Sequence, residues 1–159
     1  MNYETSREIE VAIANHFGIR QNIIVPNVSW GMFGYELDLC ILNCKSMYAS
    51  EVEIKISKSD LKRDSKKYRP HERNGNLIRQ LWFAMPEKLK GCEEFVPEKA
   101  GIVYVSKLGI TWEYRHSEIN KIARKWNIEE SYKLARLGTM RIWKLKWNRI
   151  IKEESQKGG

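Results

Sequence analysis

The stretch that decides the fold is residues 35–56, YELDLCILNCKSMYASEVEIKI. Apolar side chains alternate with other residues over 37–41 and again over 52–56. An alternation of period two predicts β-strands, and the polar segment 43–46 predicts a turn between them. We therefore expect an antiparallel hairpin whose second strand runs from Met47 to Ile56.

Segments of alternating helical and extended character lie on both sides of this hairpin. Helical spacing and capping residues predict helices, whereas β-branched runs predict strands. In chain order we expect a helix at 5–17, a strand at 22–30, the hairpin, a basic helix at 57–67 capped by Ser57 or Ser59, and a strand at 81–85. This order, α-β-β-β-α-β, predicts an α/β fold with a mixed sheet flanked by helices.

The rest of the chain continues the same pattern and then becomes helical. Residues 87–95 predict a helix, and residues 101–106 and 109–114 predict two strands. A C-terminal helical extension is expected over about 117–154, with a Ser117 cap and a division or kink at Gly138. The 159 residues suit one domain, with a core at about 5–115.

The composition indicates the cellular compartment of the protein. Charge interrupts every apolar stretch before the length of a membrane span, and the N-terminus does not resemble an export signal. The three cysteines form no metal-type pairing, and an odd number fits a reducing environment. We expect a cytoplasmic protein without a membrane span.

The charge balance indicates a polyanionic partner. The chain has 28 Lys and Arg against 20 Asp and Glu, for a formal net charge of +8. Such an excess attracts nucleic acid through the release of counterions, so nucleic acid is the leading partner. The alternative is a basic surface that only maintains solubility.

Ionised side chains in the hairpin mark the candidate site. If the turn has four residues, Asp38 pairs with Glu51 and Glu53 is diagonal to it; a two-residue turn places Asp38 directly opposite Glu53. Either register gathers the carboxylates and Lys55 on one face, within about 5 to 8 Å. The alternative is an ordinary sheet with one solvated face.

Two carboxylates at this separation suit a hard cation with oxygen ligands, as Mg²⁺ is usually bound. Such an ion neutralises charge on a phosphate and lowers the pKa of a bound water. The Lys55 ammonium can orient that water or stabilise the pentacovalent phosphate. We therefore expect a Mg²⁺-dependent phosphodiesterase, with Mn²⁺ as a substitute.

These residues resemble the PD-(D/E)XK nuclease core. Asp38 is followed after fourteen residues by Glu53-Ile54-Lys55 within the predicted α-β-β-β-α-β order, and the resemblance covers about residues 5–85. The proline of the family name is absent, because Leu37 precedes Asp38. Residues 25–30 (VPNVSW), 51–59 (EVEIKISKS) and 83–87 (FAMPE) are also similar to the MmcB-like DNA-repair group and related phage proteins.

The resemblance implies a restriction endonuclease-like fold and a metal-dependent deoxyribonuclease, an endonuclease of DNA repair, recombination or phage DNA processing. It implies metal ligation by Asp38, Glu53 and the Ile54 carbonyl, with Lys55 assisting the nucleophilic water. A carboxylate on the first helix often reaches the metal through water; Glu10 is our candidate and Glu8 the alternative. It also implies DNA as partner, a homodimer, and a bacterial or phage-encoded protein of the host cytoplasm.

Basic side chains after the Glu53 motif are expected to contact the phosphate backbone, unless they form only a solvated helix face. They are Lys58, Lys62, Arg63, Lys66, Lys67, Arg69 and Arg73. Trp143, Trp147 and Ile150 recur at helical spacing, for which we expect core packing or a dimer surface, with base stacking as the alternative.

Two further functions stay open from the sequence. One is a DNA-binding module of the same fold that does not cut. The other is a protein-interaction factor that uses the Trp-rich C-terminal helix. The sequence leaves open the structure or sequence of the DNA, DNA against RNA, and endonuclease against exonuclease action.

Overall fold

The predicted hairpin is present, and its register places Asp38 opposite Glu53. Strands β2 (Leu37–Asn43) and β3 (Ala49–Ile54) are antiparallel, with pairs from Leu39–Val52 to Leu42–Ala49. The Asn43 side chain fixes the turn, since its Oδ1 accepts the N–H groups of Lys45 and Ser46. One pair beyond Leu39–Val52, this register places Asp38 opposite Glu53.

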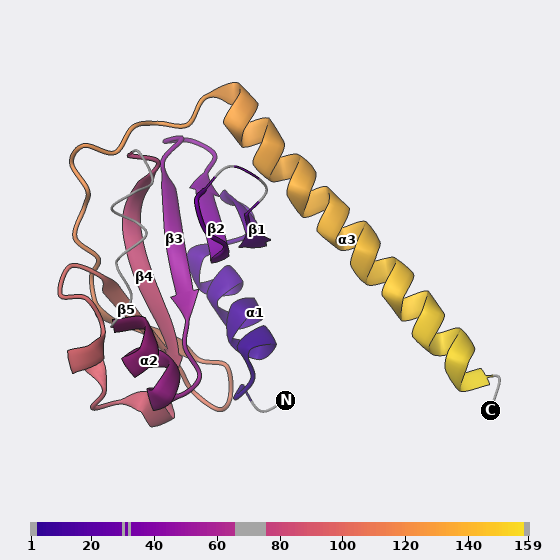
Figure 1. Cartoon of the computed structure of the whole chain (residues 1–159), viewed down its shortest axis with the longest axis horizontal. Helices are drawn as coiled ribbons and strands as arrows, with labels where there is room; N and C mark the ends of the chain where they lie inside the picture. The colour runs from indigo at the N-terminus through magenta and orange to yellow at the C-terminus, as the bar shows by residue number, and fades with distance from the viewer. Residues whose placement is uncertain (1–2, 30, 32, 66–75, 158–159) are drawn as a thin grey trace.

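The computed structural model describes residues 3–29, 31, 33–65 and 76–157. Six strands form one mixed sheet in the order β1-β2-β3-β4-β5-β6 (Figure 1). β2 is antiparallel to both β1 and β3, β4 and β5 continue parallel to β3, and β6 is antiparallel to β5. The α/β class with a mixed sheet and flanking helices is therefore confirmed.

The first six elements follow the expected α-β-β-β-α-β order. They are α1 (Ser6–Phe17), β1 (Asn22–Val28), β2, β3, α2 (Lys58–Ser65) and β4 (Ile78–Pro86). Thr5 and Glu8 form a reciprocal capping box at the start of α1, and Gly18 ends the helix with φ of 86°. The Ser57 hydroxyl accepts the N–H of Asp60 at the start of α2.

Helices α1 and α2 cover opposite faces of the sheet. Ile9 and Ile13 of α1 pack against the cluster that contains Trp82 of β4, whereas Leu61 of α2 packs against the cluster that contains the next residue, Phe83. Successive side chains of a strand point to opposite faces, so these two contacts lie on the two sides of β4. The carboxyl-bearing part of β3 runs between these two apolar layers.

The helix expected over residues 87–95 is wrong. Two short 3₁₀ turns, η2 (Glu87–Leu89) and η3 (Glu93–Phe95), stand in its place. Gly91 between them has φ of 86°, a left-handed conformation that interrupts a helix. The chain then enters β5 (Gly101–Val105) and β6 (Thr111–Arg115), close to the two expected strands.

The helix expected to begin at Ser117 is also wrong. Residues 117–127 instead run beside the N-terminal half of β4, which has no paired β5 residue before Trp82. The Ser117 hydroxyl accepts the N–H of Leu81, and the Asn120 N–H and side-chain amide donate to the carbonyls of Arg79 and Ile78. Open backbone groups of β4 thus hold this segment extended.

The C-terminal helix α3 (Ile128–Lys157) is continuous through Gly138, so the expected division there is wrong. Its first half packs on β1, where a Cβ at Gly138 would lie 3.1 Å from Cγ2 of Val25. The second half extends away from the sheet (Figure 1). Among the described residues, no helix has the length and apolar character needed to cross a membrane.

Candidate active site

Asp38 is held at the end of the β2–β3 ladder by a backbone contact. Its Oδ2 accepts the N–H of Ile54 at 2.8 Å. The neighbouring N–H of Lys55 turns to the other side and donates to the Ala84 carbonyl of β4. Hydrogen bonds to β2 on one side and to β4 on the other therefore hold the end of β3, and the bond on the β2 side is made by the Asp38 side chain itself.

Glu53 and Lys55 form a half-enclosed ion pair on β3 and its extension. The Lys55 Nζ lies 2.7 Å from Glu53 Oε2, and the two side chains are 12% and 17% exposed, respectively. Their i and i+2 positions on an extended chain place them on one face. The structure thus brings together Asp38, Glu53 and Lys55, the three residues predicted to carry the chemistry.

Glu51 is a further carboxyl of this site; the sequence analysis placed it on the same face but gave it no catalytic or metal-binding role. It is 1% exposed, and its Oε2 accepts the Tyr35 hydroxyl at 2.7 Å. Burial raises the pKa of Glu51 to about 8, and the nearby carboxylates Glu53 and Asp38 add to this increase. At neutral pH, Glu51 is therefore mostly a neutral acid. The alternation of Glu51, Glu53 and Lys55 was the signal that could have identified it.

Helix α1 contributes Glu10 to the same region. Burial raises the pKa of Glu10, and the negative charge of Asp38 raises it further. Glu8 points elsewhere, because its carboxylate accepts the N–H groups of Glu4 and Thr5 in the capping box. The capping box therefore occupies the Glu8 carboxylate, and Glu10 is the α1 carboxyl whose pKa responds to the charge of Asp38.

The oxygen atoms of this site are suitable ligands for a hard divalent cation, on one condition. Among the residues that the structure describes, no three His, Cys, Asp or Glu side chains form a ready-made metal cluster. Mg²⁺ does not require one, since it commonly uses one or two carboxylates and keeps several waters. Asp38, Glu53 and the Ile54 carbonyl could supply such a set. The condition is that Glu53 shares its carboxylate with, or releases it from, Lys55.

The predicted phosphate-contacting residues divide into described and undescribed members. Lys58, Lys62 and Arg63 are exposed on α2. Lys58 and Lys62 lie 5.7 and 5.2 Å from the centre of the Phe95 ring, and Arg63 pairs with Asp60 at 2.7 Å. Lys66, Lys67, Arg69 and Arg73 lie outside the described residues.

A cleft of about 590 Å³ lies beside the N-terminal half of β4 and does not include the carboxyl cluster. Its wall contains cations, amides and one carboxylate from β4 and the chain just before it, from the segment just before β5, and from the extended segment after β6. Gln80, which lies in this wall, pairs with Ser50 on β3, three residues before Glu53. The polar residues that line it include Asn76, Arg79, Gln80, Lys99, Glu118, Asn120 and Lys121.

No protein-family model matches this sequence, and no curated protein sequence matches it. A solved structure with a similar fold is the SPO1766 protein of unknown function from Silicibacter pomeroyi. The two chains share 15% sequence identity over 93% of this chain and 90% of that chain, with a TM-score of 0.57. At this identity the similarity shows a shared fold and nothing about activity.

Proposed function

We propose that this protein is a metal-dependent deoxyribonuclease that hydrolyses DNA phosphodiester bonds, acting as an endonuclease. The observation that supports this most strongly is the register that sets Asp38 opposite Glu53, with Lys55 on the same face in contact with Glu53. The three side chains belong to an α-β-β-β-α-β core, in which the resemblance to PD-(D/E)XK nucleases gives each of them a role. DNA repair, recombination or phage DNA processing is the proposed setting.

Asp38 and Glu53 act as the proposed metal ligands, together with the carbonyl of Ile54. Bound Mg²⁺ would neutralise charge on the scissile phosphate and lower the pKa of an attacking water. The Ile54 N–H restrains the Asp38 carboxylate, so this ligand needs little reorganisation when the ion arrives. Glu10 is close enough to Asp38 for its pKa to respond to that charge, which suits a contact through water.

Lys55 has the role of a positioned cation. In the structure its ammonium rests against Glu53, 2.7 Å from Oε2. A divalent ion at Glu53 would compete with this contact and leave the ammonium available to hold the attacking water or the phosphate oxygens. Neutral Glu51 lies beside them without adding a further full negative charge at pH 7.

The test is cleavage of circular, linear and four-way-junction DNA by the purified protein with Mg²⁺, Mn²⁺ or EDTA. We expect cleavage with either metal, none with EDTA, and none for Asp38→Ala or Glu53→Gln. Glu36→Gln is the matched control, because Glu36 is an exposed carboxylate two residues before Asp38. The substrate that is cut fastest defines the preferred DNA structure.

A second candidate is a DNA-binding module of the same fold that does not cut. The Lys55–Glu53 ion pair favours it, because an ammonium already occupies one carboxylate of the proposed metal site. Tight DNA binding without cleavage under any metal condition would support this candidate over the nuclease.

A further inference from the structure

The outer half of α3 is exposed to solvent but carries many large apolar side chains. Every side chain from Ile142 to Gln156 is exposed. Six of these residues are large and apolar: Ile142, Trp143, Leu145, Trp147, Ile150 and Ile151, all between 45% and 68% exposed. Leaving this much apolar surface in water is costly, so the segment has the character of a binding surface.

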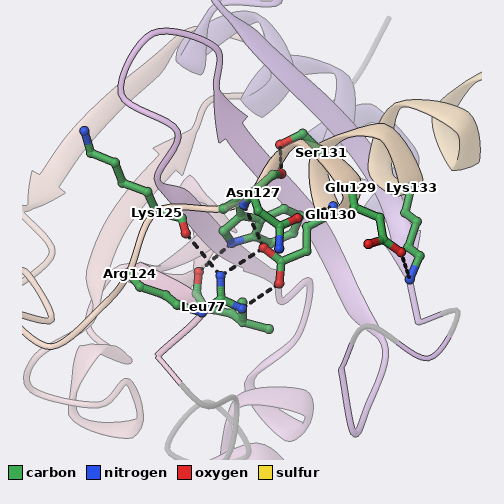
Figure 2. Close-up of polar contacts among 9 residues, drawn as sticks. Leu77, Arg124, Lys125, Asn127, Glu129, Glu130, Ser131 and Lys133 are labelled. Atoms are coloured by element: carbon green, nitrogen blue, oxygen red, sulfur yellow. Dashed lines mark hydrogen bonds and ion pairs between the residues drawn. The ribbon is translucent and has the colours of Figure 1, made fainter.

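The helix is held firmly where it joins the body. Figure 2 shows Arg124 and Asn127 converging on Glu130 in the first turn of α3. Arg124 forms two contacts with the Glu130 carboxylate, at 2.5 and 2.9 Å, and Asn127 caps the Glu130 N–H at 2.8 Å. Arg141 makes a contact farther along, donating to the Asn27 carbonyl at 2.9 Å. The outer half thus projects from an anchored base.

Half of the protein's formal net charge of +8 lies on α3, and the cations are gathered in the middle of the helix. Residues 133–152 contain seven Lys and Arg and no Asp or Glu, so this segment carries a formal charge of +7. Four Glu at the two ends of the helix, together with Lys157, bring the whole of α3 to +4. The middle of this helix is therefore one concentrated source of the attraction for polyanions that the composition predicts.

Two tryptophans lie among these cations on one side of the helix. Trp143 and Trp147 are four residues apart, which places them on the same face, and each is 64% exposed. The Lys146 Nζ lies 5.1 Å from the centre of the Trp143 ring. Exposed aromatic rings beside lysines are the combination that proteins use to stack unpaired bases and hold the phosphates between them.

The distribution of side chains disfavours two other occupants. Helices that lie on anionic membranes separate an apolar face from a basic face, whereas the outer half of α3 also carries large apolar side chains on the side of its cations. Ile142 and Leu145, for example, lie on the side opposite Trp147. In a second copy of α3 packed alongside the first, the cations of residues 133–152 would face one another and repel, because the acidic residues of α3 lie only at its two ends.

We propose that the outer half of α3, residues 142–156, binds single-stranded DNA, with Trp143 and Trp147 stacking on unpaired bases and the neighbouring lysines contacting phosphates. The choice of DNA rests on the proposed nuclease function, in which α3 would hold the single strand. Fifteen helical residues span about 22 Å, enough for several nucleotides of an extended strand. Branched or gapped DNA, which offers unpaired bases beside duplex, is the substrate class that this implies.

The test measures binding of a fluorescent 20-nucleotide oligodeoxythymidine by anisotropy in EDTA, where cleavage does not interfere. We expect the Trp143→Ala, Trp147→Ala double variant to bind at least ten-fold more weakly, from stacking losses of this order for each base. Replacing both by Phe should restore most of the affinity. Leu145→Ala, which removes an equally exposed apolar side chain from the same helix, should bind like the parent.

The charge contribution is read from the salt dependence. The Lys144→Gln, Lys146→Gln double variant should lower the slope of log affinity against log salt by about 1, as expected for the loss of roughly two phosphate contacts. Circular dichroism of each variant verifies that α3 remains helical.

Three outcomes would overturn the proposal. They are unchanged binding by the tryptophan variant, an equal loss in Leu145→Ala, and tighter binding to vesicles with anionic headgroups than to the oligonucleotide. Binding is measured in EDTA, so it is tested separately from cleavage. A protein that binds the oligonucleotide through α3 but cuts no DNA with any metal would refute the nuclease function alone. A protein that cuts DNA but does not bind through α3 would refute only the single-strand-binding proposal.

Discussion

The carboxylate of Asp38 accepts the backbone N–H of Ile54 at 2.8 Å, and this one contact joins the two halves of the candidate site. It restrains Asp38 against the strand that carries Glu53 and Lys55. It also provides a partner for a partly buried backbone donor at the end of the β2–β3 ladder. Asp38 therefore has a structural contribution that can be separated from its proposed chemical one.

Substitution of Asp38 should distinguish these two contributions. Asp38→Asn keeps an oxygen that can accept the Ile54 N–H, so we expect its free energy of unfolding to stay within about 1 kcal/mol of the parent. Asp38→Ala leaves that N–H without this acceptor and should cost roughly 1 to 3 kcal/mol. Urea denaturation measures both. Equal stability of the two variants would show that the contact does not support the fold, whereas cleavage should be lost in both.

Glu51 should make the stability of the metal-free protein fall with increasing pH. Its pKa is about 8 in the folded state against 4.5 for the free side chain, so between these values the folded protein holds a proton that the unfolded chain has lost. The stabilisation is fully present below about pH 4.5 and disappears as the pH rises through 8. The expected slope in this window is up to about 1.4 kcal/mol per pH unit.

Glu51→Gln isolates that effect, since glutamine keeps an acceptor for Tyr35 but does not titrate. Denaturation in EDTA from pH 5 to 8 should show a flatter dependence for Glu51→Gln than for the parent. Glu36→Gln, an exposed carboxylate, should retain the parental slope. Identical slopes for the parent and Glu51→Gln would contradict a buried, protonated Glu51.

Gly101 should tolerate no side chain. A Cβ at this position would overlap the indole of Trp82, which is 3% exposed in the core beneath α1. Gly101→Ala must displace that ring and should lower the free energy of unfolding by about 1 to 3 kcal/mol. Gly34→Ala is the control, because a Cβ there meets no atom within 4 Å, and a change below about 0.5 kcal/mol is expected. Thermal unfolding of both variants measures the difference.

Asn127 should stabilise the base of α3. Its Oδ1 accepts the Glu130 N–H, and its own N–H donates to the Glu130 carboxylate. Asn127→Ala should cost about 0.5 to 2 kcal/mol, whereas Asn127→Ser should retain most of the stability. Asn148→Ala alters an exposed asparagine of the same helix and should be neutral or slightly stabilising. A loss in Asn148→Ala equal to that in Asn127→Ala would exclude capping as the cause.

The sequence was sufficient for the hairpin and for the first six elements, because local periodicity and capping residues act over a few positions. The choice between two registers needed the structure, since the decisive contacts of the Asn43 side chain with the turn do not follow from alternation alone. The structure likewise supplied Glu51, whose burial depends on Tyr35, sixteen residues away.

The segment after β6 shows why helical spacing misled the prediction. Ile119, Ile122 and Trp126 recur as on a helix, but the N-terminal half of β4 is not paired with β5, and its open edge offers backbone partners that a helix cannot use. Core packing of Trp143, Trp147 and Ile150 is also wrong, because α3 leaves the sheet after Arg141. Both outcomes depend on distant parts of the chain. The alternative of a dimer surface stays a prediction.

The central claim is that Lys55 takes part in metal-dependent cleavage. The most direct measurement is the single-turnover rate of DNA cleavage in Mg²⁺ by the parent, Lys55→Ala and Glu36→Gln proteins, at enzyme concentrations that saturate the DNA. We predict that Lys55→Ala cuts at least about 100-fold more slowly while binding DNA as the parent does, and that Glu36→Gln cuts at the parental rate. Cleavage by Lys55→Ala at the parental rate, or a parent that cuts no DNA with any divalent metal, would contradict the account.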